Sequence, residues 1–251
     1  MGSGFKVAIE DSNFTGIRSF TKGGVIFAGT EANQGPPMQT TGNTAASITE
    51  FTITDSIFYD FIDLAAIDAH CTCDCMKNYE RYGYLFFLDQ DPALVFSISN
   101  TIIDNFSNKS VNLTTSLSLN KKYIYPDDEN CYTDYTSASG GSIIYLKSKG
   151  TISVNSNDNY YRGADLTDEG GVYYVSATSK NDNGQIEGCE FIEENSTYEG
   201  NQAIFGGAIY AEECRENIKI TNTTFKNNRA LQGGAIMTLY SKIEDTSGVY
   251  Q

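Results

Sequence analysis

The residues of this chain that could bind a metal ion or react as nucleophiles are concentrated in one short segment. His70, Cys71, Cys73 and Cys75 lie within six residues, and His70 is the chain's one histidine. An alternating Cys-x-Cys-x-Cys strand would place three thiols on one face, whereas zinc sites normally space their cysteines by two to four residues. We therefore expect disulfides, to Cys131 or to a neighbouring cysteine, with a metal site or free thiols as the alternatives.

Carboxylates form the second group of side chains that could do chemistry. They lie in loop-like segments: Asp89, Asp91, Asp127, Asp128, Glu129, Asp165, Asp168 and Glu169. A polysaccharide-cleaving enzyme needs two or three carboxylates on one groove, often with a basic residue, and few Lys or Arg lie near these positions. We expect a solvated acidic surface and no catalysis. No cofactor is expected, although loop oxygens could hold a structural Ca²⁺ ion. Patterns typical of Ser-His-Asp, Walker and Rossmann sites are absent.

The charge balance excludes two classes of partner. The 251 residues carry 17 Lys and Arg against 32 Asp and Glu, a formal net charge of −15. Binding of nucleic acid and docking to anionic lipid both require clustered basic side chains. No run of 18 apolar residues occurs, so we expect no membrane span in this segment, and the start of the chain has no apolar signal-peptide region.

Cysteines and glycosylation sequons together predict an extracellular or cell-surface protein. The even count of six cysteines suits disulfides and an oxidising compartment. Three sequons crowd into residues 105–114, as in a glycosylated loop. The Asn-x-Ser/Thr sequons of the whole chain begin at Asn13, Asn105, Asn108, Asn112, Asn195 and Asn222.

The elements that must position these residues are visible as an internal repeat. A hexapeptide of the form Ile-x-[Asp/Asn/Gly]-[Ser/Thr/Cys]-x-[Phe/Ile] occurs five times, and a looser copy spans residues 154–160. An apolar residue two positions ahead of most copies adds the period-two alternation of a strand with one buried face. The first and sixth positions are the candidate core residues: Ile9 and Phe14, Ile53 and Phe58, Ile98 and Ile103, Ile186 and Phe191, Ile220 and Phe225.

A glycine doublet comes after each hexapeptide, and residues 65–67 (Ala-Ala-Ile) are taken as the degenerate copy of the second repeat. Repeat starts at residues 9, 53, 98, 154, 186 and 220 give final steps of 32 and 34 residues, which we take as closest to the bare unit. Glycine permits backbone conformations closed to other residues and a close approach between layers. The doublets are Gly23-Gly24, Gly140-Gly141, Gly170-Gly171, Gly206-Gly207 and Gly233-Gly234.

Such a repeat predicts a solenoid, because one unit cannot bury its apolar face alone and neighbouring units must stack. Gly, Asn, Thr and Ser disfavour helices, and the apolar spacing is two. We therefore predict an all-β parallel β-helix of about six irregular coils, in a single domain over residues 1–251. Inward Ile and Phe side chains would stack about 4.8 Å apart. The Asp or Asn of each hexapeptide would form a turn, since these residues tolerate left-handed conformations and can form hydrogen-bonded ladders.

The longer steps between repeats contain insertions at residues 29–48, 68–92 and 104–138. Insertions in a solenoid leave from the turns and lie on one side of the stack, where a binding role would be placed. Cys189 and Cys214 lie about one coil apart. They could form a disulfide that ties an insertion to the body, or remain buried free thiols.

Two segments near the end of the chain resemble the repeats of polymorphic outer membrane proteins. Those repeats carry Phe-x-x-Asn and Gly-Gly-Ala-[Ile/Leu/Val]. Phe225, Asn228 and residues 233–236 match both, and residues 198–210 match with Tyr198 in place of Phe. The resemblance covers about the last third of the chain and weakens upstream. It implies a right-handed, pectin-lyase-like β-helix that serves as an adhesin on cell surfaces.

We therefore predict a non-catalytic extracellular structural or adhesive module, such as a spacer, an adhesin or a filament-building segment. Its partners would be other copies or further coils stacked end to end, because no capping helix follows the last repeat, and also glycans or surface proteins. The chain would then be a segment of a longer protein or assembly. A polysaccharide lyase or hydrolase on the same fold, and an intracellular or lumenal scaffold, are the alternatives, since one fold hosts many functions.

Overall fold

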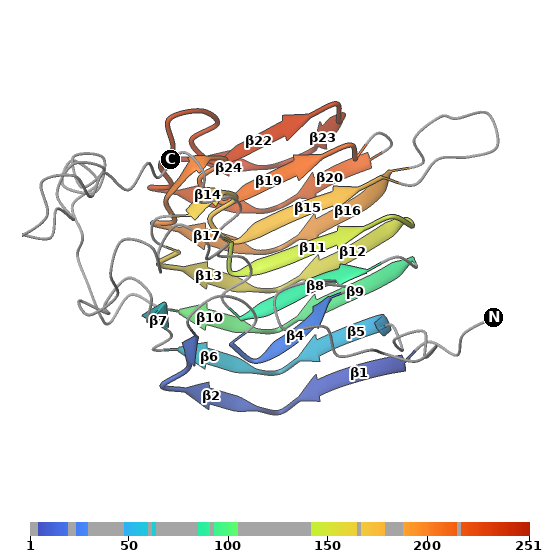
Figure 1. The fold of residues 1–251 in the computed structure, drawn as a ribbon. Coiled ribbons are helices and arrows are strands. Elements are labelled where there is room, and N and C mark those ends of the chain that lie inside the picture. Colours follow the sequence, from blue (N-terminus) through green and yellow to red (C-terminus); the bar gives the residue numbers. More distant parts are fainter. Residues whose placement is uncertain are drawn as a thin grey trace, which may run out of the picture.

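The chain folds into a right-handed parallel β-helix in the computed structural model, which confirms the predicted fold class (Figure 1). All regular elements in the described ranges are strands, and the strands of three sheets stack in parallel along one axis. The pectin-lyase-like subclass stays a prediction. The structure describes residues 5–19, 24–29, 48–59, 62–63, 85–90, 93–104, 142–164, 167–178, 188–214 and 217–251.

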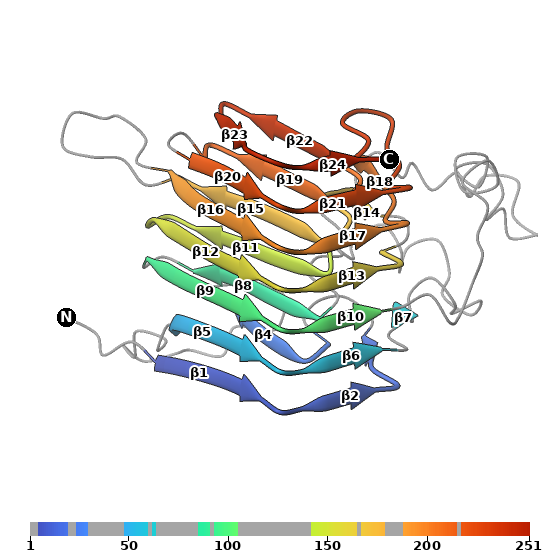
Figure 2. The same ribbon diagram turned by 180° about the vertical axis from the view of Figure 1, so that it is seen from behind.

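Three sheets form the sides of the stack, and we number them 1 to 3 in the order in which each coil passes through them. Sheets 1 and 2 face the viewer in Figure 2. Sheet 1 contains β1 (Phe5–Glu10), β5 (Ile48–Thr54), β9 (Leu94–Ser99), β12 (Ile152–Asn157), β16 (Cys189–Glu194), β20 (Asn217–Thr221) and β23 (Ile243–Asp245). Sheet 2 contains β2 (Asn13–Thr15), β6 (Ile57–Tyr59), β10 (Ile102–Asp104), β13 (Tyr160–Arg162), β17 (Thr197–Glu199), β21 (Thr224–Lys226) and β24 (Val249–Tyr250). Sheet 3 contains β4 (Ile26–Gly29), β8 (Phe86–Gln90), β11 (Ile144–Ser148), β15 (Tyr173–Ala177), β19 (Ile209–Glu212) and β22 (Ile236–Leu239).

Coils are numbered from the N-terminal end, and each passes through sheets 1, 2 and 3 in turn. Coils 1 to 6 supply one strand to every sheet, and a seventh coil supplies β23 and β24. The hexapeptide pattern did not predict the seventh coil, because Asp245 occupies the first position of the hexapeptide, where the pattern requires Ile. Two short pairs lie beside the main sheets: β3 (Arg18–Ser19) with β7 (Ile62–Asp63), and β14 (Thr167–Glu169) with β18 (Ala203–Phe205).

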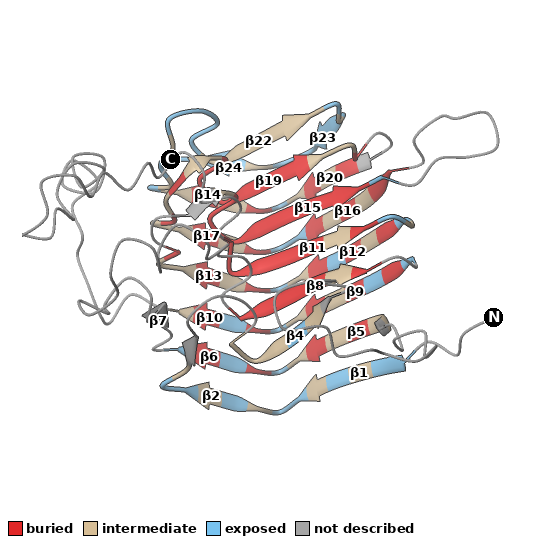
Figure 3. Ribbon diagram, in the orientation of Figure 1, coloured by how far each residue is buried: buried red, intermediate tan, exposed pale blue. Residues whose placement is uncertain are grey.

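Columns of like side chains fill the inside of the stack, which Figure 3 shows as buried. Phe14 stacks on Phe58 with a ring-centroid distance of 4.8 Å, and Tyr198 stacks on Phe225 at 4.9 Å. These distances equal the spacing of neighbouring strands, so parallel register alone brings the rings into contact. Full burial of such rings is the main favourable contribution to folding in a narrow core.

Two copies of the hexapeptide are misaligned by the sequence pattern. Phe191 was predicted in the column of Phe225, but it pairs with Ile218, seven positions ahead of Phe225. Val154, the predicted first position of the looser copy, pairs with Phe191 and so lies in the column of Ile218 as well, two positions ahead of Ile220. The position of Ile220 is held in coil 5 by Glu193 and in coil 4 by Ser156. The hexapeptide pattern requires Ile at its first position. Coils 4 and 5 have Ser156 and Glu193 there, so the pattern was aligned on other residues in these two coils.

The bare unit is also shorter than predicted. Glu193 and its counterpart Ile220 are 27 residues apart, and Ile220 and its counterpart Asp245 are 25 apart. The predicted steps of 32 and 34 residues are wrong because the fifth copy was aligned on Ile186, seven residues ahead of Glu193. Ile186 lies outside the described residues.

Left-handed Asp and Asn residues make the turn between sheets 1 and 2. The hydroxyl of the next residue then links two coils: Ser56 Oγ donates to the carbonyl oxygen of Thr54 at 2.7 Å and accepts from the N–H of Ser12 at 3.2 Å. Asp and Asn suit this position because they tolerate the left-handed region better than other non-glycine residues. The turn residues have φ between 46° and 56°: Asp11, Asp55, Asn100, Asp158, Asn195 and Asn222.

The two glycines of a doublet meet different constraints. The first is left-handed, with φ of 66°, 62° and 64° at Gly170, Gly206 and Gly233. The second allows close approach: a Cβ on Gly207 would overlap the carbonyl oxygen of Gly234 in the next coil, and Gly171 is equally constrained by Gly207. Gly24 leads into β4, whereas Gly23, Gly140 and Gly141 lie outside the described residues.

One predicted insertion extends too far. Phe86 of β8 pairs with Ile26 on one side and Ile144 on the other, so residues 85–90 are part of coil 2 and not of an insertion over 68–92. Residues 65–67 were predicted to lead coil 2 into sheet 3, with Ile67 at the position of Ile26, but Phe86 occupies that position. The prediction is wrong because coil 2 has no glycine doublet ahead of its sheet 3 strand to mark where the strand begins. Residues 30–47 and 105–141, which contain most of the other two insertions, lie outside the described residues.

Candidate binding groove

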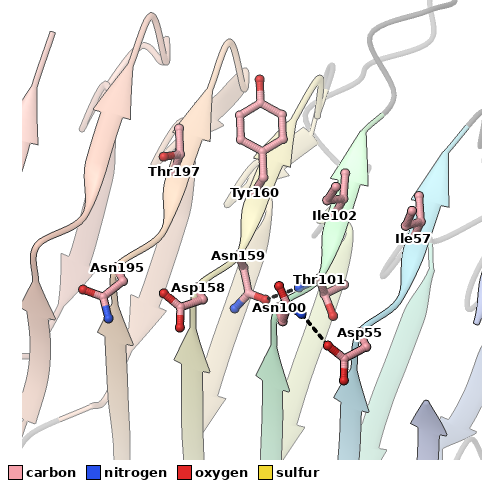
Figure 4. A pocket seen from close by; sticks show the side chains of 10 residues that line it. All are labelled: Asp55, Ile57, Asn100, Thr101, Ile102, Asp158, Asn159, Tyr160, Asn195 and Thr197. Atoms are coloured by element: carbon pink, nitrogen blue, oxygen red, sulfur yellow. Dashed lines mark hydrogen bonds between the residues drawn. The ribbon is translucent and has the colours of Figure 1, made fainter. Parts of the chain in front are cut away.

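A groove runs along the outside of the stack at the corner between sheets 1 and 2 (Figure 4). It crosses coils 2 to 5 and has a volume of about 430 Å³. The left-handed turns create it, because they change the direction of every coil at the same place. We call it the corner groove, and its lining residues are Asp55, Ile57, Asn100, Thr101, Ile102, Asp158, Asn159, Tyr160, Asn195 and Thr197.

One wall of the corner groove consists of outward side chains of sheet 2. Ile57 and Ile102 are 39% and 41% exposed, and Tyr160 and Thr197 continue the row in the next two coils. The Tyr160 hydroxyl donates to Glu199 at 2.8 Å. Burial, together with this hydrogen bond to a carboxylate, raises the pKa of Tyr160 to about 12. The wall is therefore uncharged at any physiological pH and largely apolar.

The other wall is the row of turn side chains, which forms a partial ladder. Asn100 Nδ2 donates to Asp55 Oδ1 in the coil below. Asn195 Nδ2 donates sideways to Asn157 Oδ1 at 3.0 Å, and Asn157 Nδ2 donates to Asp158 Oδ2 at 2.7 Å. These bonds engage amide donors and leave carboxylate and carbonyl oxygens facing the groove.

A row of alternating charges borders the groove on sheet 2. Arg162 donates to Asp104 through Nε at 3.0 Å and through Nη2 at 2.6 Å. Lys226 lies 3.4 Å from Glu199, whose pKa is lowered chiefly by the hydrogen bond from Tyr160. Because these charges pair within the row, the net acidic character of the groove comes from its own turn residues.

A polar layer interrupts the apolar core in coils 4 and 5. Ser156 Oγ lies 3.0 Å from Glu193 Oε1, and the Tyr198 hydroxyl donates to the other carboxyl oxygen. The Tyr161 hydroxyl lies 3.1 Å from Ser156 Oγ and 2.7 Å from the Tyr173 hydroxyl. All five residues are buried. Desolvation raises the pKa of Glu193 to about 8, although hydrogen bonds from neighbouring hydroxyls oppose the shift.

Sheet 3 bears a second row of stacked rings on its outer face. Glu212 lies beside this row and accepts a hydrogen bond from the Tyr174 hydroxyl at 3.4 Å. Desolvation and the charge of Glu212 raise the pKa of Glu169, and Lys147 acts in the opposite direction. The rings, with centroids 4.5 to 5.6 Å apart, belong to Phe87, Tyr145, Tyr174 and Tyr210.

The two cysteines in the described part of the chain are joined to each other. Cys189 and Cys214 form a disulfide with a Cα–Cα distance of 4.3 Å, and both side chains are buried. Cys189 begins β16 and Cys214 follows β19, so the bond closes coil 5 into a covalent ring. Of the two alternatives that the sequence left open, the disulfide is the one observed, and it lies within one coil instead of tying an insertion to the body. Cys71, Cys73, Cys75 and Cys131 lie outside the described residues.

Three of the sequon asparagines can be placed. Asn13, Asn195 and Asn222 are all exposed. The amide nitrogen of Asn222, to which a glycan would be attached, donates to Asn195 Oδ1 at 2.9 Å. Asn195 and Asn222 thus have structural roles independent of any glycan. The clustered sequons at Asn105, Asn108 and Asn112 lie outside the described residues.

The acidic candidates of the sequence are not the acids of the corner groove. Asp89 lies in β8 and Glu169 in β14, both on sheet 3 or beside it. Asp55 was assigned only to a turn, and Asp158 was given no role. Asp158 takes the same position as Asp55 once its copy is aligned on Ser156 instead of Val154, and this shared position would have placed both in one row. Asp91, Asp127, Asp128, Glu129 and Asp165, and the side chain of Asp168, lie outside the described residues.

Within the described ranges, no group of three or more His, Cys, Asp or Glu side chains is placed to hold a metal ion. A structural calcium ion stays a prediction. No helix in the described part of the chain has the length and hydropathy needed to cross a membrane.

Comparison with known proteins gives one match. Residues 222–238 match the family model described as the Chlamydia polymorphic membrane protein (Chlamydia_PMP) repeat. The matched segment contains β21, Asn228 and the doublet Gly233-Gly234, which are the features that carried the resemblance. Neither the curated proteins nor the solved structures gave a match. Residues 222–238 are thus similar to a repeat of the polymorphic membrane protein type, and they lie within a parallel β-helix.

Proposed function

We propose that this chain is a non-catalytic surface module that acts in adhesion through the corner groove. The observation that carries the proposal is the groove itself, which repeats one arrangement of side chains over four stacked coils. A stack held by continuous strand pairing is rigid, so the groove is presented without the entropy cost of ordering loops. Binding surfaces of solenoids are typically extended in this way.

The geometry of the groove supports a binding role over a catalytic one. Asp55 and Asp158 stand two coil spacings apart, roughly 10 Å, with Asn100 between them. Each carboxylate accepts a hydrogen bond from an asparagine amide. No Lys or Arg is among the lining residues. The set lacks a pair of carboxyl groups held in contrasting environments, which acid–base catalysis requires.

The test is adhesion of beads coated with the whole chain to cultured cells. Ile102→Arg would fill the groove with a long charged side chain, and we expect at least tenfold fewer bound beads. Val95→Arg is the matched control, because Val95 lies in the same coil, is 40% exposed and faces outward from sheet 1. Equal adhesion by both variants would show that the groove is not the adhesive surface.

A second candidate function is a carbohydrate-active enzyme on the outer face of sheet 3. Glu169 and Glu212 interact electrostatically there, with Lys147 close enough to act on Glu169. This is the kind of acid pair with a basic neighbour that polysaccharide cleavage uses. The check is release of reducing ends from polysaccharides by the wild-type chain and by Glu212→Gln. Cleavage that Glu212→Gln abolishes would replace the adhesive proposal.

A further inference from the structure

The row of turn side chains in the corner groove offers acceptors and few free donors. Asn100 and Asn195 each commit an amide N–H within the protein, to Asp55 and Asn157. A carboxylate has no donor of its own at neutral pH. What the row presents outward is therefore a line of oxygens at Asp55, Asn100 and Asp158, one set in each of coils 2 to 4, whereas Asn195 Oδ1 already accepts from Asn222 Nδ2 at 2.9 Å.

The ladder is interrupted on both sides of Asp158, which has no hydrogen bond to Asn100 or Asn195, the turn residues of its two neighbouring coils. The structure records no hydrogen bond between Asn100 and Asp158, although they occupy the same position in adjacent coils. Below Asp158, Asn100 donates toward Asp55; above it, Asn195 turns aside to Asn157. Two acceptor groups thus face each other across one coil spacing of about 4.8 Å. A donor that bridges them has to come from solvent or from a ligand.

The opposite wall defines what else the ligand must offer. Ile57 and Ile102 present apolar surface, and the Tyr160 ring extends this surface into coil 4 (Figure 4). A ligand lying along the groove therefore meets hydrogen-bond acceptors on one side and apolar surface on the other, once in every coil. Pyranose rings have both faces, since hydroxyls project from the ring edge and C–H groups cover its flat side.

From this arrangement we propose that the corner groove binds an unbranched, uncharged oligosaccharide that runs parallel to the axis of the stack, with about one sugar in each of coils 2 to 5. The hydroxyls would donate to Asp55, Asn100 and Asp158, and would bridge the interruption of the ladder between Asn100 and Asp158. This proposal rests on the adhesive function of the groove and names its ligand class.

Charge and spacing exclude the other extended polymers. Sulfated, sialylated and phosphorylated chains would meet the carboxylates of Asp55 and Asp158 at close range. An extended peptide places side chains on one face every second residue, roughly 6.8 Å, which does not match a coil spacing of about 4.8 Å. A sugar chain advances per unit by close to one coil.

The experiment measures binding of the whole chain to immobilised cellotetraose and chitotetraose, with their disaccharides, a heparin-derived tetrasaccharide and tetralysine alongside. We expect saturable binding to a neutral tetrasaccharide and at least tenfold weaker binding to its disaccharide. Asp158→Gly should weaken binding at least tenfold, because glycine keeps the left-handed turn but removes the acceptor. Asp11→Gly is the matched control: Asp11 has φ 46° at the same position of coil 1, outside the groove.

Three outcomes would overturn the proposal: no saturable binding to either neutral tetrasaccharide, preference for the anionic or cationic probe, or equal loss in the two glycine variants. The adhesion assay separates this failure from that of the proposed function. If Ile102→Arg abolishes bead adhesion while no tetrasaccharide binds, the groove is adhesive and its ligand is not a glycan. If a tetrasaccharide binds but beads do not adhere, the groove binds a glycan and the proposed adhesive function is wrong.

Discussion

Replacing Glu193 by glutamine removes the carboxyl group of the polar layer while keeping its shape. Glu193 lies fully buried between Ser156 and Tyr198, in a column that holds Ile in coils 1 to 3 and 6. A glutamine carbonyl can still accept from one of these hydroxyls, and its amide can donate in place of the acid proton. The substitution therefore isolates the effect of ionisation.

The sign of the effect follows from the raised pKa. Burial raises the pKa of Glu193 from 4.5 to about 8, so at intermediate pH the folded chain holds a proton that the unfolded chain has released. The stabilisation by this proton is complete below pH 4.5 and is lost as the pH rises through 8. Each unit of pKa difference corresponds to about 1.4 kcal/mol, so the whole change is roughly 5 kcal/mol. Between pH 5.5 and 9 the expected loss is about 3 kcal/mol.

The assay is urea unfolding at pH 5.5, 7 and 9, followed by far-ultraviolet circular dichroism because the chain has no Trp. The wild-type midpoint should fall by about 1 M urea between pH 5.5 and 9, and that of Glu193→Gln should stay nearly constant. At pH 5.5 the variant should be less stable by about 1 kcal/mol, the usual cost of one imperfect hydrogen bond. At pH 9 it should be the more stable protein.

Glu194→Gln is the control, since Glu194 is the next residue of β16 and is exposed. It removes the same charge from the surface and should leave the pH dependence of the wild type in place. Parallel pH profiles for wild type and Glu193→Gln would refute the reasoning, because they would mean that the carboxyl titrates normally or stays ionised throughout.

Three further sets of variants test the other structural arguments. Gly207→Ala should lower the free energy of unfolding by about 3 kcal/mol or more, since the new Cβ overlaps a backbone carbonyl, whereas Gly234→Ala, with its nearest neighbour at 3.8 Å, should be close to neutral in the same urea titration. Replacing both Cys189 and Cys214 by Ala should cost about 3 kcal/mol, the value for a closed loop of 25 residues, and dithiothreitol should lower the unfolding midpoint of the wild type by more than that of this variant. Tyr198→Phe should lower the free energy of unfolding by about 2 kcal/mol, because Glu193 loses a hydrogen-bond donor inside the core. Phe225→Tyr should also lower it, because the new hydroxyl would lie opposite the apolar side chain of Ile220. An unchanged free energy of unfolding in either variant would contradict the pairing of polar groups described above.

The architecture could be predicted from the sequence because its causes are local and repeated. Alternating apolar residues mark a strand with one buried face wherever they occur. Asp11, Asp55 and Asn100 mark the turns because few other residues accept a left-handed backbone. The glycine doublets mark the third corner, where Gly207 leaves no room for a Cβ. Each of these signals depends on one residue and its neighbours, so one chain without an alignment is enough to show them.

The corner groove could not be predicted in the same way. Its apolar wall comes from Ile57 and Ile102, at the variable fifth position of the hexapeptide, where the fold imposes no residue type. The interruptions of its ladder at Asp158 depend on Asn100 donating to Asp55 and on Asn195 donating to Asn157, so that neither amide donates to Asp158. Which partner each of these side chains bonds to depends on the three-dimensional geometry, and the repeat pattern of the sequence does not indicate it.

The polar layer, by contrast, left a signal that the hexapeptide pattern overlooked. Where the first position is polar, the sixth is tyrosine: Ser156 with Tyr161, Glu193 with Tyr198, and Asp245 with Tyr250. Where the first position is Ile, the sixth is Phe or Ile. The hydroxyl explains the coupling, because a residue five positions ahead, across the left-handed turn, is the group that it reaches inside the coil. Tyrosine at the sixth position therefore predicts a polar partner at the first position, and this rule would have placed coils 4, 5 and 7 in their correct register.

Coil 5 combines the most costly core residue with the covalent ring. An ionised Glu193 would weaken the column at this level alone, and in a stack whose coils contact mainly their neighbours such weakness stays local. The disulfide between Cys189 and Cys214 restricts that same coil when it opens. Its contribution of about 3 kcal/mol is smaller than the roughly 5 kcal/mol that ionisation removes, so it offsets only part of the loss. The junction of coils 4 and 5 should therefore be where the stack opens first in alkaline solution.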